Sequence, residues 1–583
     1  MIFQPSNLKR KLFFILADSL IIAFSTFIAF GLRFDFSFAP QYAHSLYLTV
    51  VLLVLARVAL YYIYRIYDIS WRHFGFRDTT TLVFATIIPT VILIFSAYAL
   101  QGTQLIIPRS IIPIEFFITL FLILSLRISK RLVLEGKKLN LDGKATIVLA
   151  DLDRANNILR TINNPESQYY PVAIINDNYS NVKINRVEVY SLEKFISLGI
   201  ECEVAIIDKQ IDLAPMYDQI KSLGITTIKV ASDYSDYGAQ INDVSVEDLL
   251  ARHPKDLDKN RIADFIKDKT IFVTGAGGSI GSEICRQCEI FGAKKLILID
   301  HSEYNLYMIT EELSKVEKVS VMQSVTDKQR MCKTFELYKP DIVIHAAAYK
   351  HVPLVEENID EAIVNNIVGT KNMIDLSIEF GIDKFVLIST DKAVRPTNVM
   401  GTTKRICELY AQNSNGKGTD IVAVRFGNVL GSSGSVIPKF RSQIEKGGPI
   451  TVTHPEITRY FMLINEACEL VLQAGAIATG GEIFILDMGE PVRIVDLAKK
   501  MLELSGKKNI EIQFSGLRPG EKLYEELLID DSDAKTEYES ITVAAPTYYN
   551  LEQLNSDIQE LLTCKDKIKK LKEIVPEFEH RLN

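Results

Sequence analysis

Four long apolar runs dominate the first quarter of the chain. They cover residues 12–32, 45–64, 82–100 and 110–126, and they contain very few charged side chains. At a rise of about 1.5 Å per residue, helices of this length can cross the roughly 30 Å hydrocarbon core of a bilayer. The first run is too long for a signal peptide, and it has no small-residue cleavage site. The pattern predicts a transmembrane region of four helices over residues 1–140.

Basic residues cluster on one side of the predicted bilayer. They precede the first run, separate the second from the third and follow the fourth, as Lys9, Arg10, Lys11, Arg65, Arg72, Arg77, Arg127, Lys130, Arg131, Lys137 and Lys138. The other two loops hold little besides Arg33 and Arg109. Because basic loops stay on the cytoplasmic side, both ends of this region are predicted to be cytoplasmic.

Three ionisable residues, Asp18, Arg57 and Glu115, lie inside the apolar runs. Charged groups in a bilayer cost several kcal/mol, which makes them candidates for function. We favour the alternative that they pair between helices or reach toward the interface. The spans could anchor an enzyme or form a small lipid-handling bundle, and the sequence leaves both possibilities open.

The pattern changes over residues 145–232, where short β-branched runs alternate with polar helical stretches. This alternation predicts a small parallel α/β domain, which we place at residues 141–240. The turn after its first strand, at residues 150–153, contains no glycine that would let a pyrophosphate approach the backbone. We therefore expect a structural or regulatory module here.

A glycine-rich loop opens the last α/β region, which spans residues 241–583. An apolar strand at 271–274 leads into Gly275, Gly278 and Gly281 and then into a helix. The first glycine permits a tight turn, the second lets phosphates approach the helix N-terminus, and the third lets the helix pack on the strand. The next strand ends in Asp300, which can bond ribose hydroxyls and would repel a 2′-phosphate. The pattern predicts a dinucleotide-binding domain that holds NAD.

Two later positions fit the same domain. Asp327 follows the third strand and is expected to reach the adenine, and Ala346 and Ala347 end the fourth strand beside the cofactor. The net charge of −7 and the pI near 5.8 argue against a nucleic-acid partner.

The seven cysteines do not form a disulfide pattern. All lie from Cys202 onward, scattered and odd in number, which favours a reducing compartment. Cys285 and Cys288 share the helix after the glycine loop, and we expect ordinary packing rather than a redox or zinc site.

The candidate chemistry lies after the fifth strand, at residues 385–390. Thr390, Asp391 and Lys392 leave the carboxyl end of this strand, where open α/β sheets bind ligands. A lysine follows on the next helix as Lys404, and the position four residues before it holds Met400. In short-chain dehydrogenases a tyrosine at that position does the acid–base work, and a thioether cannot take a proton. Deprotonation of a substrate hydroxyl must then pass to Asp391, Thr390 or a bound water.

Several motifs together carry a resemblance to a known family. TGAGGSIGSE, HAAAYKHVPLVE, STDKAVRPTNVMGTTKR, RFGNVLGSSGSVIPKF, TRYFM and LRPGEKLYEEL occur in this order. The chain resembles the membrane-bound UDP-N-acetylglucosamine 4,6-dehydratases of bacterial glycan synthesis, which are extended short-chain dehydrogenase/reductases. The resemblance is strong from about residue 241 onward, and before it extends only to the layout. It implies a multi-pass protein of the bacterial inner membrane, with its catalytic domain in the cytoplasm and a homo-oligomeric state.

The resemblance also implies roles for particular residues. NAD would take hydride from C4 of the sugar and return it to C6, while Lys392 removes the C5 proton and Asp391 protonates the departing C6 hydroxyl. Thr390 would bond the C4 oxygen, and Lys404 would hold the nicotinamide ribose. Further expected cofactor contacts are Ser279, Ile280 and Ser302, and expected substrate contacts are Lys350, Asn428, Arg459, Arg518 and Glu521. Retention of configuration at C5 follows from the resemblance alone.

Two other functions compete with the dehydratase. An NAD-dependent UDP-sugar 4-epimerase would need the tyrosine and has no use for an acid–base pair at C5–C6, so Met400 and the Asp391–Lys392 pair count against it. A membrane-tethered NAD-sensing scaffold would leave the sugar unchanged.

Overall fold

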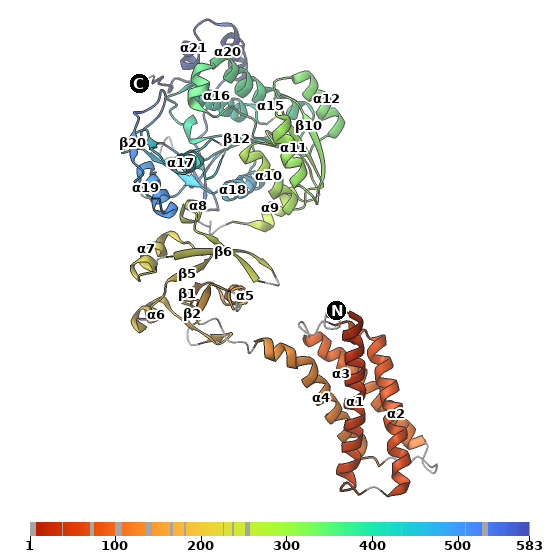
Figure 1. Ribbon diagram of the computed structural model, residues 1–583. Coiled ribbons are helices and arrows are strands. Elements are labelled where there is room, and N and C mark those ends of the chain that lie inside the picture. The colour runs from red at the N-terminus through yellow and green to blue at the C-terminus, as the bar shows by residue number, and fades with distance from the viewer. Residues whose placement is uncertain are drawn as a thin grey trace. The chain divides into compact units, whose positions relative to one another are not determined.

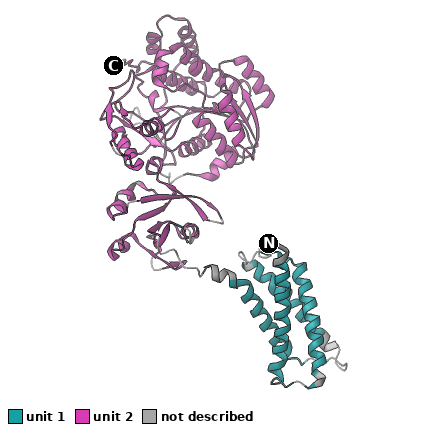
Figure 2. Ribbon diagram, viewed as in Figure 1, with its two compact units in different colours: residues 1–142, 163–167 teal, residues 143–162, 168–583 magenta. Residues whose placement is uncertain are grey.

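The computed structural model describes residues 7–37, 39–69, 75–99, 108–135, 143–163, 167–179, 182–225, 227–235, 238–250, 257–416, 418–432, 434–507, 509–527 and 534–581. The chain divides into two compact units (Figure 2). The first comprises Met1–Asp142 with Asn163–Ser167, and the second comprises Gly143–Ile162 with Gln168–Asn583.

In its described part, the first unit is a bundle of apolar helices. These are α1 (Asn7–Arg33), α2 (Pro40–Ile63), α3 (Phe76–Ala99) and α4 (Ile111–Glu135), with a short turn η1 (Ile66–Asp68). Each helix contains an apolar stretch of 19 to 24 residues, which is long enough to cross a membrane. The four predicted helices are therefore confirmed. The flanking residues Arg72, Lys137 and Lys138 lie outside the described residues.

Two buried ion pairs join the helices of this bundle. Arg57 on α2 donates to both carboxylate oxygens of Glu115 on α4, at 2.5 and 2.8 Å. Arg127 on α4 donates to Asp18 on α1 at 2.6 Å. The expectation that the ionisable residues pair between helices is confirmed. The expectation that Arg127 lies beyond the last span is wrong, because α4 continues past it and buries its side chain in the bundle.

The second unit begins with a seven-stranded sheet of order β3-β4-β2-β1-β5-β6-β7. Its strands are β1 (Lys144–Leu149), β2 (Tyr169–Ile175), β3 (Lys183–Ile184), β4 (Val187–Tyr190), β5 (Val204–Asp208), β6 (Thr227–Ser235) and β7 (Gly238–Asp243). The five inner strands are parallel, and β3 and β7 are antiparallel at the edges. The helices α5 (Leu152–Ile162), α6 (Leu192–Leu198) and α7 (Ala214–Ser222) pack on its faces. This confirms a small parallel α/β fold, and the expected boundary at residue 240 falls within β7.

A nine-stranded sheet follows, of order β10-β9-β8-β11-β12-β13-β18-β22-β21 (Figure 1). Its strands are β8 (Thr270–Thr274), β9 (Lys295–Asp300), β10 (Glu317–Met322), β11 (Ile342–His345), β12 (Lys384–Ile388), β13 (Asp420–Arg425), β18 (Ile483–Leu486), β21 (Ala534–Lys535) and β22 (Ile541–Val543). The first seven strands in this order are parallel, and the direction of winding reverses between β8 and β11. This is the doubly wound order in which a ligand binds at the point of reversal.

Helices cover both faces of this sheet, because the strand residues are apolar on both sides. In β8, Ile271 and Val273 pack against one layer of helices and Phe272 against the other. The first layer contains α9 (Lys259–Ile266), α10 (Ser279–Ile290), α11 (Glu303–Glu312) and α18 (Ile464–Ile477). The second contains α12 (Lys328–Tyr338), α15 (Gly369–Glu379), α16 (Val399–Ser414), α20 (Leu551–Thr563) and α21 (Lys567–Ile574). The predicted α/β class is confirmed.

A smaller subdomain is built from segments that leave the sheet after β13 and β18. It contains α17 (Val436–Glu445), α19 (Ile494–Ser505) and the short strand pairs β14 (Asn428–Val429) with β17 (Phe461–Met462), β15 (Ile450–Val452) with β20 (Ile512–Phe514), and β16 (Thr458–Arg459) with β19 (Val492–Arg493). The connecting helix α8 (Val246–Leu250) packs into the core of this subdomain. The subdomain forms one wall of the cavity described next.

Candidate active site

A cavity of about 940 Å³ opens at the carboxyl edge of the nine-stranded sheet. Its walls come from the glycine loop after β8, from the segments that follow β11, β12 and β13, and from the smaller subdomain. Segments far apart in the sequence thus meet at the point where the strand order reverses.

The glycine loop packs so closely against neighbouring backbone that side chains do not fit at two of its glycines. Gly275 has a φ of +66°, and a Cβ there would lie 2.9 Å from the backbone of Ala346 and Ala347. A Cβ on Gly281 would lie 2.0 Å from the carbonyl oxygen of Gly275, so side chains are excluded where α10 meets the loop. Gly278 caps α10, whose first N–H groups form an anion site at the helix N-terminus. This cradle fits a pyrophosphate.

Asp300 lies at the end of β9, beside this cradle. Its carboxylate is buried and accepts hydrogen bonds from the N–H groups of Gly277 at 2.9 Å and Ser302 at 2.8 Å. It therefore ties the glycine loop to the start of α11. Its position at the strand end agrees with the expected place of a ribose-binding acid.

The other expected cofactor residues divide into two groups. Ser279, Ile280 and Ala346 line the cavity, whereas Asp300, Ser302, Asp327 and Ala347 do not belong to its lining. Ser302 and Asp327 cap helices, because their side chains accept from backbone N–H groups in the first turns of α11 and α12. Capping of α12 is thus one role of the Asp327 carboxylate, and its contact with the adenine stays a prediction.

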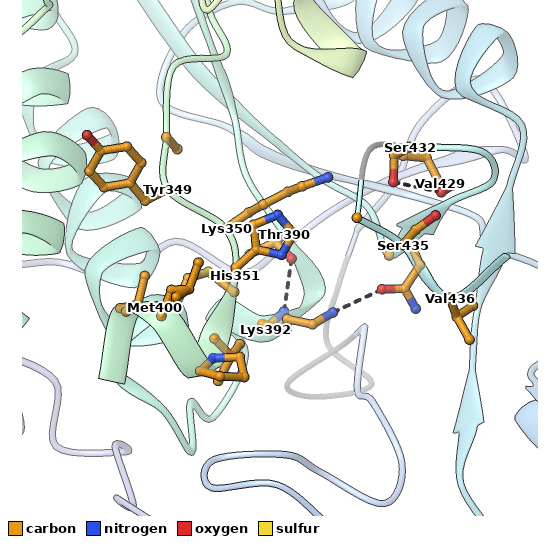
Figure 3. Close-up of a pocket in the computed structure, with 18 of the residues that line it drawn as sticks. Tyr349, Lys350, His351, Thr390, Lys392, Met400, Val429, Ser432, Ser435 and Val436 are labelled. Carbon is orange, nitrogen blue, oxygen red and sulfur yellow. Dashed lines mark hydrogen bonds between the residues drawn. The ribbon is translucent and has the colours of Figure 1, made fainter. Parts of the chain in front are cut away.

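Thr390, Asp391 and Lys392 leave β12 as the short helix η3 (Asp391–Ala393). The Thr390 hydroxyl donates to Asp391 Oδ1 at 2.8 Å, and Lys392 Nζ donates to the same oxygen at 3.1 Å. Thr390 and Lys392 line the cavity (Figure 3), while Asp391 is fully buried behind them. The three residues are brought together as expected, but Asp391 reaches the cavity only through its two neighbours.

Lys392 is held among several polar groups. Besides Asp391, its Nζ donates to Asn428 Oδ1 at 3.3 Å and lies 3.7 Å from Glu525 Oε1. Burial alone would lower the pKa of Lys392, but the carboxylates of Asp391 and Glu525 outweigh burial and raise this pKa. Lys392 is consequently an ammonium ion at neutral pH.

Met400 and Lys404 lie on the first turns of α16, and both line the cavity. Both are buried, and burial lowers the pKa of Lys404. Met400 brings a thioether to the position where a tyrosine would exchange protons (Figure 3). A thioether cannot take a proton, so Met400 cannot do the acid–base work of a tyrosine.

The expected substrate residues Lys350, Asn428, Arg459, Arg518 and Glu521 all line the same cavity. Arg459 is held by the carbonyl of Lys522 at 2.9 Å and lies 3.4 Å from a Glu521 oxygen. Glu521 also accepts from the backbone N–H of Arg518 at 3.1 Å. Burial and the charge of Lys392 lower the pKa of Lys350. Two arginines at the wall suit bidentate binding of a diphosphate.

Sequence reasoning missed two residues that shape this site. Glu525 lines the cavity beside Lys392, and Asn366, in a π-helical turn at 363–368, bonds the backbone N–H and carbonyl of Tyr349 at 2.8 and 3.1 Å. Asn366 thereby fixes the segment that carries Lys350. The motif LRPGEKLYEEL contains both Glu525 and Glu526, but its pattern does not say which of the two acids faces the cavity.

Cys285 and Cys288 are buried in the core between α10 and the sheet. Burial raises the pKa of Cys288 to about 12, which keeps this thiol protonated and unreactive. Among the described residues, no group of three or more His, Cys, Asp and Glu side chains is placed to hold a metal ion.

Comparison with known proteins gives the family. A model described as "Polysaccharide biosynthesis protein" matches residues 271–546. The capsular polysaccharide biosynthesis protein CapD of Staphylococcus aureus is 39% identical over 97% of this chain and 98% of its own. The probable polysaccharide biosynthesis protein EpsC of Bacillus subtilis is 40% identical over 83% of this chain and 84% of its own. A UDP-glucose 4-epimerase of Rickettsia rickettsii is 34% identical over 46% of this chain and 80% of its own. Because the similarity to CapD runs along nearly the whole of both proteins, the chain belongs to the polysaccharide biosynthesis protein family.

Proposed function

We propose that the protein is an NAD-dependent 4,6-dehydratase that converts UDP-N-acetylglucosamine into UDP-2-acetamido-2,6-dideoxy-4-keto-hexose. The observation that carries this proposal is the Asp391–Lys392 pair, held at 3.1 Å beside the cavity that the glycine loop also lines. Oxidation at C4 acidifies the neighbouring C5–H, and an acid next to a base suits the loss of water across C5–C6. Hydride transfer alone would need no such pair.

The cofactor assignment is supported by the shape of the loop. Gly275 and Gly281 allow a tight turn packed against the backbone, where any Cβ would clash, and Asp300 lies where a 2′-phosphate would be repelled. When bound, NAD would supply the hydride acceptor and donor that carry hydrogen from C4 to C6. Lys404 would hold the nicotinamide ribose from α16.

The proton transfers can be assigned to the chain's own residues. Lys392 begins as an ammonium, so it must give a proton to Asp391 Oδ1, 3.1 Å away, before it can act as a base. The neutral amine then takes the C5 proton, and the protonated acid supplies the proton with which the C6 hydroxyl leaves as water. After both steps Lys392 is an ammonium and Asp391 a carboxylate again, so the charges balance.

Thr390 provides a path for the second of these protons. Asp391 does not line the cavity, whereas Thr390 does and donates to Asp391 Oδ1 at 2.8 Å. The Thr390 hydroxyl can accept a proton from Asp391 while it passes its own to the departing oxygen. The same hydroxyl is also a candidate to receive the C4 proton, since Met400 cannot.

The setting of the reaction follows from the first unit and the family. Four apolar helices would hold the protein in the bacterial inner membrane as a multi-pass protein, with the second unit in the cytoplasm. The product would serve the synthesis of a capsule or a related glycan, as the name of the Staphylococcus aureus relative suggests. A homo-oligomeric state remains a prediction.

A 4-epimerase is the second candidate, and it is favoured by the similarity to the Rickettsia rickettsii protein of that name. Met400 and the Asp391–Lys392 pair both count against it. An NAD-sensing scaffold is a third, non-enzymatic alternative.

Product analysis distinguishes all three. The full-length protein, purified in detergent, would be incubated with UDP-N-acetylglucosamine and the nucleotide sugars identified by NMR. We expect a 4-keto-6-deoxy sugar with the configuration at C5 retained. UDP-N-acetylgalactosamine would indicate the epimerase, and unchanged substrate with NAD bound would indicate the sensor.

A further inference from the structure

Glu525 is a buried acid next to the reacting pair. Its side chain is 4% exposed, and it lies in the segment between β20 and β21, far along the chain from Lys392. One oxygen, Oε1, lies 3.7 Å from Lys392 Nζ and 3.5 Å from Arg459 Nε. The other oxygen, Oε2, is buried and makes no hydrogen bond within the part of the chain that the structure describes.

Leaving a carboxylate oxygen buried and unbonded is costly, so such a group calls for an explanation. Packing does not supply one, because Glu525 lines the cavity rather than the hydrophobic core. Arg459 does not need Glu525 as a partner for its own charge either. That guanidinium already donates to the carbonyls of Thr458 at 2.6 Å and Lys522 at 2.9 Å, and it lies 3.4 Å from Glu521.

The charges around Lys392 come from several elements. Asp391 faces it from η3, Glu525 from the segment after β20, Asn428 from β14, Arg459 from β16 and Lys350 from the segment after β11. Two of these groups are anions and two are cations. Without Glu525, the Lys392 ammonium would face one carboxylate and two positive charges.

We propose that Glu525 is a positioning residue of the dehydratase, which acts through Lys392 by keeping a proton on the Asp391–Lys392 pair. This inference rests on the proposed function and deepens it. The elimination needs one proton on the pair, because the proton that leaves with the C6 hydroxyl must already be on Asp391 when Lys392 takes the C5 proton. Once the pair has lost that proton to solvent, no acid remains for the leaving group.

The consequence is a specific pH dependence. The charges of Asp391 and Glu525 raise the pKa of Lys392 above its ordinary 10.5, so the fully active form persists to alkaline pH. Activity is then lost as the pH rises through this pKa. A neighbouring opposite charge typically moves a pKa by about 1–3 units. Removing the charge of Glu525 should therefore move the alkaline limb of kcat to lower pH by about 1–3 units.

The test compares two adjacent residues in the full-length protein. Glu525→Gln keeps the shape of the side chain and removes its charge. Glu526→Gln is the matched control, because Glu526 pairs with Arg395 and Lys522 and does not line the cavity. For each protein, kcat with UDP-N-acetylglucosamine is measured from neutral to strongly alkaline pH, together with KM and the bound NAD.

We expect the alkaline limb of the pH profile of kcat to move to lower pH in Glu525→Gln and to stay in place in Glu526→Gln. An unmoved limb in Glu525→Gln, or an equal movement in the control, overturns the inference. A loss of rate at every pH with no movement of the limb would mean a purely structural role and also overturns it.

A second variant covers the case of misfolding, and the wild-type product separates a failure of this inference from a failure of the proposed function. If Glu525→Gln does not fold, Glu525→Asp decides. A carboxylate one methylene farther away should move the limb by a smaller but measurable amount, and an unmoved limb overturns the inference. If the wild-type protein forms no 4-keto-6-deoxy sugar, the proposed function fails. If it forms this product and the limb does not move, only the role of Glu525 fails.

Discussion

Replacing Glu408 by glutamine should destabilise the second unit far more than replacing an exposed acid. Glu408 lies on α16, fully buried, and its two oxygens accept from Arg425 at 2.6 and 2.7 Å. The hydroxyl of Ser389, the residue before Thr390, also donates to it at 2.7 Å. The glutamine side chain has the same size but no charge, so the Arg425 guanidinium would be left buried beside a neutral amide.

The size of the effect follows from the burial of both partners. Arg425 is 1% exposed and Glu408 is 0% exposed, so water cannot screen or replace the lost interaction. Removing one partner of a buried ion pair typically costs about 3–5 kcal/mol, most of it from the charge left behind. For comparison, Glu312 pairs with Arg286 at 2.8 Å on the surface, where both side chains are more than 40% exposed. Such an exposed pair contributes about 0–1 kcal/mol.

The effect should also depend on pH. Burial opposes ionisation of Glu408, but the guanidinium groups of Arg425 and Arg405 outweigh it and hold the pKa of Glu408 below its ordinary 4.5. The stabilisation is therefore complete above about pH 4.5, the value expected in the unfolded chain. It is lost as the pH falls through the lower pKa of the folded state.

Thermal and urea unfolding of the full-length protein in detergent would measure the difference. Unfolding would be followed by the fluorescence of an NAD analogue or by hydrogen exchange of the second unit, with Glu312→Gln as the control. A loss below about 1 kcal/mol for Glu408→Gln would refute the reasoning from burial. A loss that does not shrink as the pH falls below about 4.5 would refute the assignment to the charge of Glu408.

Three other predictions concern the active site. In heavy water, Lys392→Ala should slow dehydration by about 10²–10⁴-fold and abolish deuterium incorporation at C5, whereas Asp391→Asn should mainly block departure of the C6 hydroxyl. Solvent deuterium at C5 in the Lys392→Ala product would contradict this role of Lys392. Met400→Leu should keep most activity because the change nearly conserves volume, and a loss as severe as that of Lys392→Ala would reveal a chemical role for the sulfur. Gly281→Ala should weaken NAD binding about tenfold or more in calorimetry, since its Cβ would lie 2.0 Å from the Gly275 carbonyl oxygen, and unchanged affinity would contradict the cradle.

Much of the fold could be predicted because its strongest signals are local. The four long apolar helices follow from continuous apolar runs, and the parallel strands follow from β-branched runs between helical stretches. Strands β3 and β7 are harder to predict because they lie at the sheet edges, where the apolar pattern that marks inner strands is weak. The burial of Arg127 was missed for a related reason. The positive charge of Arg127 suggests that the apolar part of the helix ends before it, but Arg127 forms a buried ion pair with Asp18 inside the helix bundle.

The parts of the active site that lie within one motif were predictable. The end of β12 positions Thr390, and the glycine loop positions its own glycines. In both cases residues close in sequence fix the geometry. Asp327 shows the limit of this reasoning. An acid after a strand can cap the next helix as well as contact a ligand, and capping depends on how the following residues turn. Asn366 was out of reach because a π-helical turn, and not a motif, brings it to Tyr349.

The two lysines of the site show why its chemistry needs the tertiary structure. Lys404 is buried and Lys392 is half-buried, and both lie in the stretch that follows β12. Burial lowers the pKa of Lys404, while two carboxylates raise the pKa of Lys392. In many enzymes, different environments give two groups of the same kind different pKa values, so that one can act as the acid and the other as the base. One of the two carboxylates, Asp391, is adjacent in sequence, but the other comes from Glu525 more than a hundred residues later. The protonation state of Lys392 is thus set by a contact that the folding of the smaller subdomain onto the sheet creates.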